Sequence, residues 1–431
     1  MTGVALDALD TPDRLNQREP SWRREARLAA IDWLATHSMP TRHDESWRYT
    51  PADELVDLLG VAVHPRTSFG LASGQVDFMA ADHGGPRLVF VNGVFAPGPS
   101  YLRDVAGVTA RPLSELGRNT APGPVLETDR LDGFVALNCL AGDDGAVITV
   151  TADAAAATPI HIVHVAAPHL DSCLITHPSA VVRIQPDATA TIIESYVGFT
   201  GTALTNAATV IDVHDSASLS YDRVQTEDPG ASHIGHVRIR AGRDTTVKCT
   251  SFSIGGRISR VAFDISLVGD RSQLDVDGLY VPAGDDRHDH VIAAEHLGSH
   301  TRSSQRFKGV VDDHARGSFT GQVVVQAGTI DTVADQTNHS LLLTATAESD
   351  TRPWLEILAD DVRCTHGATV GRLDDEALFY LRTRGISEPE ARRVLIEGFT
   401  SEVIDSVAVE TLRDHLSTRI RAKQRRLKDQ R

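Results

Sequence analysis

The sequence predicts a mainly β protein whose core is a right-handed parallel β-helix, or solenoid, flanked by N-terminal and C-terminal helical regions. Three observations favour this fold class. Aromatic residues make up only 5% of the chain, whereas Val, Ala, Thr, Asp and Gly, which favour strands and tight turns, are frequent. Apolar and polar residues alternate over roughly 200 residues. Turns built around one aspartate return at a nearly constant interval.

The first region, residues 1–85, is expected to be mainly helical. From residue 21 onward, apolar side chains recur every three or four positions, which predicts an amphipathic helix with Ser21 as its N-cap. Met39 and Pro40 should end this helix, because a proline disfavours helical backbone in the residue before it. The stretch that follows is expected to be a short helix or an ordered loop.

The core is expected to span residues 86–372, where the hydrophobic period changes from 3.6 to 2. The alternation is clearest in five segments: 159–165, 180–186, 208–214, 236–242 and 321–328. The turns place Asp187, Asp215, Asp244 and Asp270 beside small or hydroxyl residues, at intervals of 28, 29 and 26 residues. A turn with this period is typical of a solenoid whose coils stack on one another. The alternative is a large β-sandwich with coincidentally even turns.

The last region, residues 373–431, is expected to be helical again. Asp374 should cap one helix, which Gly385 ends. Ser387 and Glu390 have the spacing of a capping box, which predicts the start of a second helix. A third helix with apolar residues at every fourth position should follow. Helices in this place either cover the end of a solenoid or bind another protein.

Composition and charge narrow the function. The net charge of −16 disfavours a nucleic-acid partner, because phosphate backbones are also negative. The N-terminus lacks the basic start and apolar segment of a signal peptide, and no apolar run is long enough to span a membrane. We therefore expect a cytoplasmic protein without nucleic-acid or membrane partners. Four cysteines lie far apart, without the paired spacing of disulfide frameworks or structural zinc sites: Cys139, Cys173, Cys249 and Cys364.

Signatures of common catalytic sites are missing from the sequence. It contains no GxxxxGK[ST] phosphate loop and no GxGxxG dinucleotide motif. It also lacks the GxSxG elbow of α/β-hydrolases and the HExxH motif of zinc proteases. The sequence thus gives no indication of nucleotide binding or of a common hydrolase mechanism.

Cys364 and His366 are the first candidate site. On a strand, residues two apart face the same way at about 7 Å, and thiolate and imidazole are suitable ligands for iron. Two ligands are too few for a stable cluster, which needs about four. A site here must share ligands with another chain or bind its metal transiently. The alternative is a purely structural role, with Cys364 as a small buried side chain beside an unrelated histidine.

A second concentration of potential ligands lies within residues 285–300. Its members are Asp285, Asp286, His288, Asp289, His290, Glu295, His296 and His300. We interpret this segment as a solvated turn, with weak metal binding as the alternative. If it were a strand, His288 and His290 would share one face.

Residues 359–386, which include Cys364-Thr365-His366-Gly367, closely resemble the C-terminal signature of the SufD family of iron–sulfur cluster assembly proteins. Further family landmarks occur in the same order along the chain: residues 45–50, 134–138, 307–310, 319–321 and 341–343. The related SufB family typically has His-Glu-Ala where this chain has His366-Gly367-Ala368. Val370-Gly371-Arg372-Leu373-Asp374 also favours SufD over SufB.

This resemblance implies a non-catalytic scaffold subunit of a SufBCD-type complex, with a β-helix core and the ATPase activity in another chain. It implies a heterodimer with a SufB-like subunit, with the isolated chain able to homodimerise. The nascent cluster would lie at the SufB–SufD interface, where His366 would be a transient metal ligand shared with the partner, beside Cys364. No cofactor would be held tightly by this chain alone; the complex would hold a transient Fe–S cluster or iron.

The resemblance also implies that a SufC-like ATPase binds the C-terminal helices. The residues expected to contact it are Leu378, Phe379, Tyr380, Leu381, Arg382, Arg384 and Gly385.

Three other functions stay open at this point. A β-helical enzyme acting on polysaccharides would need a cleft of carboxylates, for which Asp285, Asp286 and Asp289 are the candidates. A transferase could use Cys364 as nucleophile and His366 as base, although side chains two apart on a strand point in parallel rather than toward each other. A SufB-type scaffold is the third alternative.

Overall fold

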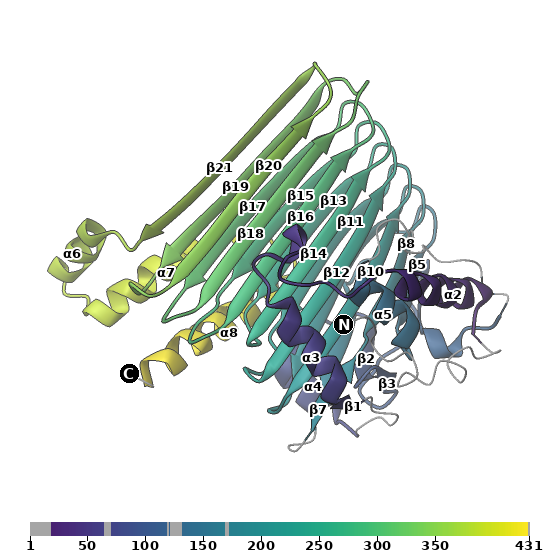
Figure 1. Cartoon of the computed structure of the whole chain (residues 1–431), viewed down its shortest axis with the longest axis horizontal. Helices are drawn as coiled ribbons and strands as arrows, with labels where there is room; N and C mark the ends of the chain where they lie inside the picture. Colours follow the sequence, from purple (N-terminus) through teal and green to yellow (C-terminus); the bar gives the residue numbers. More distant parts are fainter. Residues whose placement is uncertain (1–18, 64–69, 119, 121–131, 169–171, 430–431) are drawn as a thin grey trace.

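The core of the computed structural model is a solenoid of two facing β-sheets, with helices before and after it (Figure 1). The structure describes residues 19–63, 70–118, 120, 132–168 and 172–429. Each coil adds one strand to each sheet, and the strands of successive coils pair in parallel. Parallel pairing excludes the antiparallel β-sandwich and confirms the predicted solenoid. The boundaries between the three regions stay a prediction.

From β8 onward, the strands alternate between the two sheets along the chain. Sheet A contains β1 (Ala62–Val63), β4 (Val108–Pro112), β5 (Ala146–Val150), β7 (Cys173–Thr176), β8 (Ser179–Ile184), β10 (Ala203–Val213), β12 (Ala231–Ala241), β14 (Ile258–Leu267), β16 (Arg287–His296), β18 (Arg316–Val325) and β20 (Glu348–Ile357). Sheet B contains β2 (Arg87–Val91), β3 (Val94–Phe95), β6 (Ile160–Ala166), β9 (Thr189–Gly198), β11 (Ser218–Gln225), β13 (Thr246–Ser253), β15 (Gln273–Tyr280), β17 (Arg302–Val311), β19 (Thr332–Leu342) and β21 (Val362–Arg372).

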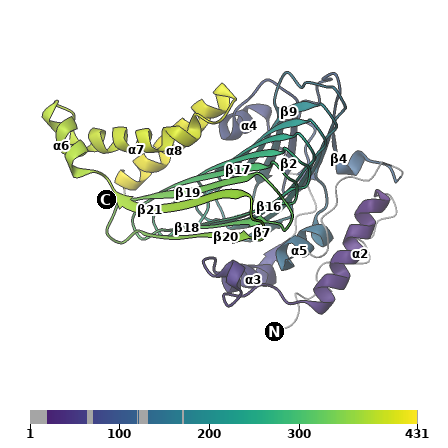
Figure 2. The same ribbon diagram turned by 90° about the horizontal axis from the view of Figure 1, so that it is seen from above.

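Helices cover the outer faces of both sheets (Figure 2). The described α-helices are α2 (Ser21–Thr36), α3 (Ala52–Val61), α4 (Ser73–Ala80), α5 (Gly133–Ala141), α6 (Asp375–Thr383), α7 (Glu388–Ile404) and α8 (Glu410–Asp429). Helices α3 and α5 pack on sheet A through residues such as Leu55 and Phe134, and α7 and α8 pack on sheet B through Val403 and Leu416. In the described part of the chain, no helix has the length and apolar character needed to cross a membrane.

The repeated turns have one backbone feature in common. In each coil, one residue adopts a left-handed conformation with φ between 50° and 61°: Asp187, Ser216, Asp244, Arg271, His300 and Asp331. The amide of each of the first five donates to a carbonyl of the next coil's turn, for example Asp187 to Asp215 at 3.1 Å. Aspartate tolerates this conformation better than most residues, which accounts for Asp187 and Asp244; in the turns of Asp215 and Asp270 the left-handed residue is the one that follows the aspartate.

One predicted helix start and one predicted capping box need correction. Helix α2 begins at Ser21, so its N-cap is Pro20, whose carbonyl accepts from the amides of Arg23 and Arg24. The same helix ends at Thr36, before Met39 is reached. The predicted start of α7 is confirmed, with Ser387 as its N-cap, but the Ser387 side chain makes no capping bond, and Glu390 is paired with Arg393. The predicted cap at Asp374 and the end at Gly385, whose φ is +84°, are confirmed.

The interior of the solenoid changes character along its axis. One inward column of side chains, in register from coil to coil, consists of Ile160, Ile192, Tyr221, Cys249, Val276, Gln305, Gln336 and His366. Its early members belong to the main hydrophobic core, whereas its last three are polar. This column therefore changes from apolar in the first coils to polar where the solenoid ends.

Candidate functional site

The last coil of the solenoid is open. Among the described strands, β20 is bonded only to β18 and β21 only to β19, so each leaves one edge without a partner. Most residues of β21 are exposed, and outward-facing Trp354 on β20 is 45% exposed. Long edge strands with free backbone donors and acceptors are usually protected in monomeric proteins, because they pair readily with another chain.

Cys364 and His366 lie on β21 at the mouth of the lumen. They are in register with Ala334 and Gln336, two fully buried residues of β19, so both face the interior side of the sheet. Cys364 is half-buried and packs against the apolar group that contains Val323. His366 is exposed, because no further coil covers it.

The surroundings of Cys364 disfavour the thiolate. Partial burial raises the pKa of its thiol, and the nearby charge of Asp335 raises it further, while a hydrogen bond with the backbone of Ala334 acts in the opposite direction. The residues described here also contain no group of three or more His, Cys, Asp or Glu side chains arranged to hold a metal ion. The mouth thus offers a protonated thiol and one imidazole, an incomplete ligand set.

The segment 285–300 is not the solvated turn that we predicted. Most of it forms β16, and His288, His290 and His296 are buried inside the solenoid. Burial lowers the pKa of His288 to about 3 and that of His296 to about 4, so both rings are neutral near pH 7. The alternation with Ile292 and Ala294 was the sequence signal for a strand, and the many charged neighbours obscured it.

The three aspartates of this segment do not share one cleft, because Asp285 and Asp286 line a pocket that does not include Asp289. Asp289 is buried on the outer side of sheet A, where it accepts hydrogen bonds from Thr50 and Ser318, each at 2.6 Å, and pairs with Arg260. Asp286 pairs with Lys423 at 2.9 Å, and Asp285 is exposed. A polysaccharide-degrading site built on these carboxylates is not supported.

The residues predicted to contact an ATPase lie on or next to α6, which projects away from the solenoid (Figure 1). No residue of α6 is buried; Phe379 is 69% and Tyr380 57% exposed. Leu378 and Leu381 are half-buried. Arg384 lies over the ring of Tyr380, 5.1 Å from its centroid, and Arg382 pairs with Glu388 at 3.4 Å. Gly385 ends this element.

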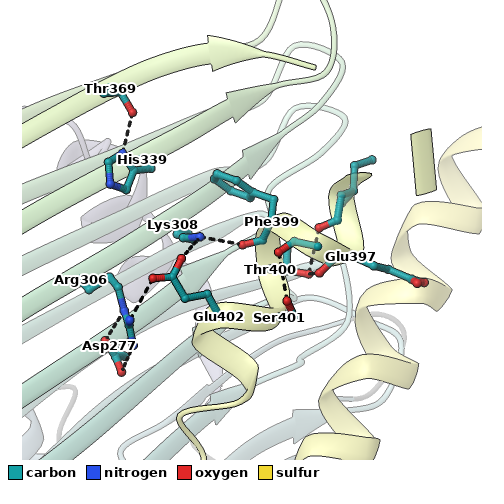
Figure 3. Close-up of polar contacts among 12 residues, drawn as sticks. Asp277, Arg306, Lys308, His339, Thr369, Glu397, Phe399, Thr400, Ser401 and Glu402 are labelled. Atoms are coloured by element: carbon teal, nitrogen blue, oxygen red, sulfur yellow. Dashed lines mark hydrogen bonds and ion pairs between the residues drawn. The ribbon is translucent and has the colours of Figure 1, made fainter. Parts of the chain in front are cut away.

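Sequence reasoning missed the polar contacts that fasten α7 to sheet B (Figure 3). Arg306 on β17 makes two hydrogen bonds to Asp277 on β15, at 2.8 and 2.9 Å, and a third to Glu402 of α7 at 3.0 Å. Lys308 pairs with Glu402 and donates to the carbonyl of Phe399 at 3.0 Å. The alternation of residues 302–311 placed Arg306 and Lys308 on one face, but nothing local identified Glu402 as their partner.

A comparison with known families now identifies the chain. A family model described as "SUF system FeS cluster assembly, SufBD core domain" matches residues 168–399, more than half of the chain. The chain belongs to the SufBD family. It is 30% identical over 419 residues to the iron-sulfur cluster assembly protein SufD of Escherichia coli, with 96% of each chain covered.

Other members of the SufBD family match over different lengths. A SufBD family protein of Synechocystis is 28% identical over 429 residues, covering 95% of this chain and 93% of its own. The SufD protein of Bacillus subtilis is 27% identical over 295 residues, about two thirds of each chain. All three relatives are named as iron-sulfur cluster assembly proteins, which confirms the resemblance to SufD.

The glycines in two of the SufBD-like motifs have a physical reason. A Cβ on Gly309 would lie 2.1 Å from the ring of Tyr280, which is on the neighbouring strand of the same sheet. A Cβ on Gly321 would lie 2.2 Å from the side-chain nitrogen of Gln336, which is on the opposite sheet. Both glycines therefore make room for large inward-facing side chains.

Proposed function

We propose that this chain is a non-catalytic scaffold subunit for iron–sulfur cluster assembly. In this proposal it pairs with a SufB-like subunit through the open end of the solenoid and binds a SufC-like ATPase through α6 and α7. His366 and Cys364 form this chain's half of a site where the cluster is built as cargo.

The observation that carries the proposal is the incomplete last coil. β20 and β21 present unpaired backbone over ten and eleven residues, and they hold Cys364 and His366 at the mouth between them. A partner whose own strands continue the sheets would satisfy the free backbone groups and bring the missing ligands to the same place. In the absence of that partner, the same edges allow two copies of this chain to pair.

Two observations support the proposed contact with an ATPase: the exposed aromatic residues of α6 and the ion pairs that attach α7 to the solenoid. Phe379 and Tyr380 form an exposed aromatic pair on a helix without buried residues, and aromatic residues are enriched at protein interfaces. The following helix, α7, is joined by ion pairs to β17, which is paired in turn with Asp277 of β15 (Figure 3). A partner that moves α7 thus acts on β17, two strands before the edge strand β21.

A Cys–His transferase is less well supported. A nucleophilic cysteine needs a lowered pKa, as next to a cation or a helix N-terminus. Here the pKa of Cys364 is raised by burial and by Asp335. The parallel projection of side chains two apart on β21 also fails to aim the imidazole at the thiol.

The proposal is tested by co-expressing the chain with SufB-like and SufC-like partners, followed by anaerobic cluster reconstitution monitored by visible absorption. His366→Ala should leave the complex intact on purification but lower the cluster yield at least about tenfold, because one ligand is lost. Thr365→Ala is the matched control on the same strand, with its side chain on the opposite face. An unchanged cluster yield in the His366 variant, or a chain that binds neither partner, would contradict the proposal.

A further inference from the structure

Three residues form a polar stack that ends at His366. Gln305 on β17, Gln336 on β19 and His366 on β21 occupy the same register position and face the lumen. Neighbouring strands lie about 4.8 Å apart, so each side chain lies directly over the next. Gln305 is 1% and Gln336 0% exposed, and only His366 reaches the mouth.

The carboxamide oxygen of Gln336 is a hydrogen-bond acceptor that is not in use. Its Nε2 donates to Oε1 of Gln305 at 2.8 Å. Its own Oε1 is buried and finds no donor among the described residues. A buried acceptor without a donor is destabilising, so this position favours the arrival of an N–H group. The next side chain in the stack, and the one at the open end, is the imidazole of His366.

The opposite sheet holds this carboxamide in place. Nε2 of Gln336 lies so close to Gly321 on β18 that a Cβ there would be 2.2 Å away, and the ring of Phe319 borders the same space. With Gln305 on one side and Gly321 on another, the amide has little freedom to rotate. A rigid polar group beside a ligand is what is needed to orient that ligand.

From this geometry we infer that Gln336 is a positioning residue for His366. A neutral imidazole donates from one ring nitrogen and accepts at the other. When the inward nitrogen donates to Oε1 of Gln336, the other nitrogen carries the lone pair and points out of the mouth, toward the cluster. The described structure gives the His366 ring no hydrogen-bond partner, so rotation about its side-chain bonds can bring it onto this acceptor. The inference rests on the proposed role of His366.

The tautomer of His366 provides a test that does not depend on cluster formation. In the full-length chain labelled with ¹⁵N-histidine, the His366 signals are assigned by their loss in His366→Ala. The wild-type protein should show one dominant tautomer, and Gln336→Leu, which has similar volume but no acceptor, should show the mixture of a free imidazole. Gly321→Ala should act like Gln336→Leu by displacing the amide. A tautomer mixture in the wild type, or an unchanged tautomer in Gln336→Leu, would overturn the inference.

Cluster yield in the complex gives the second readout. Gln336→Leu should lower the yield at least about fivefold, and Gln336→Glu, which keeps an acceptor, should restore most of it. Gln322→Leu, on the outer face of β18, is the matched control and should leave both tautomer and yield unchanged. If His366→Ala lowers the yield while Gln336→Leu changes neither readout, the positioning role is wrong and the proposed function stands. If His366→Ala has no effect on yield, the proposed function fails whatever the tautomer.

Discussion

The two ends of the solenoid are finished in different ways. At the first end, the outermost strands are β4 and β3, which are short and pair antiparallel to their neighbours. At the last end, β20 and β21 continue the parallel ladder over ten and eleven residues and then stop. Short, reversed strands are a known means of ending a sheet. The repeat is thus closed at one end and ready to be extended at the other.

One inward column of sheet B differs between the ends in the same sense. In the first coils it holds the fully buried aliphatic side chains of Ile160 and Ile192. In the last coils it holds Gln305, Gln336 and His366. Burial of aliphatic side chains supplies most of the stability, whereas polar side chains at an open mouth are available to ligands. The comparison indicates that stability comes mainly from the first coils and recognition from the last coil.

The largest expected difference between the ends is in amide hydrogen exchange. In a monomeric sample, amides of β11 and β13, which are bonded on both sides, should exchange at least about 10³-fold more slowly than those of β21 that point away from β19. Mass spectrometry of peptides from both regions measures this directly. Equal protection of β21 and β11 in the monomer would mean that the last coil is not open. A SufB-like partner should slow exchange in β20 and β21 and leave β11 unchanged.

Core substitutions should show a smaller but clear contrast. Ile192→Ala, at a fully buried position, should lower the free energy of unfolding by about 2–5 kcal/mol, because it removes buried methyl groups and leaves a cavity. Val370→Ala, at a position on β21 that is 46% exposed, should change it by no more than about 0.5 kcal/mol. Urea unfolding of both variants provides the measurement. A similar loss of unfolding free energy in both variants would contradict the expected difference in stability between the two ends of the solenoid.

The smallest expected effect concerns the attachment of α7. The hydrogen bond from Lys308 lowers the pKa of Glu402 in the folded chain. Its contribution is therefore present above the unfolded pKa of about 4.3 and is lost as the pH falls through the lower folded value. Glu402→Gln should cost about 1 kcal/mol at pH 7, a value reduced because the carboxylate is half exposed.

The difference in stability between wild type and Glu402→Gln should begin to shrink as the pH falls below about 4.3, where Glu402 of the unfolded chain becomes protonated, and should vanish as the pH falls through the lower pKa of the folded chain. Thermal unfolding at several pH values measures this dependence. Glu25→Gln, on the exposed side of α2, is a control for the loss of one negative charge. A difference in stability between wild type and Glu402→Gln that stays constant down to pH 3 would show that the ion pairs of Glu402 do not fasten α7.

The repeat made the fold predictable, and the same repeat limits what the sequence could reveal about the site. The turns at Asp187 and Asp244 return with the coil, so local patterns reported the global architecture. Cys364 and His366 were correctly expected on one face of a strand. Gln336 lies beneath His366 because 30 residues, about one coil, separate them, but the spacing of the turns does not give the register of individual strands.

Other features had no local signal at all. Glu402 meets Arg306 from 96 positions away, and no periodicity links a helix to the strand on which it packs. The burial of His288 and His290 was obscured for a different reason, because acidic neighbours gave their strand the composition of a loop. Such contacts depend on where whole elements lie in space, and composition does not report that.

Because α7 is anchored to the solenoid, the spacing of the strands fixes its distance from the last coil. The ion pairs of Glu402 reach β17, and β21 lies two strands further along the axis (Figure 3). Strand spacing fixes that separation at about 10 Å. A partner that touches both α7 and the mouth of the lumen at β21 meets them at a fixed separation along the axis, which flexible loops would not provide. Inserting one coil between the two would lengthen this offset by about 5 Å while keeping every turn and every core contact of the repeat intact.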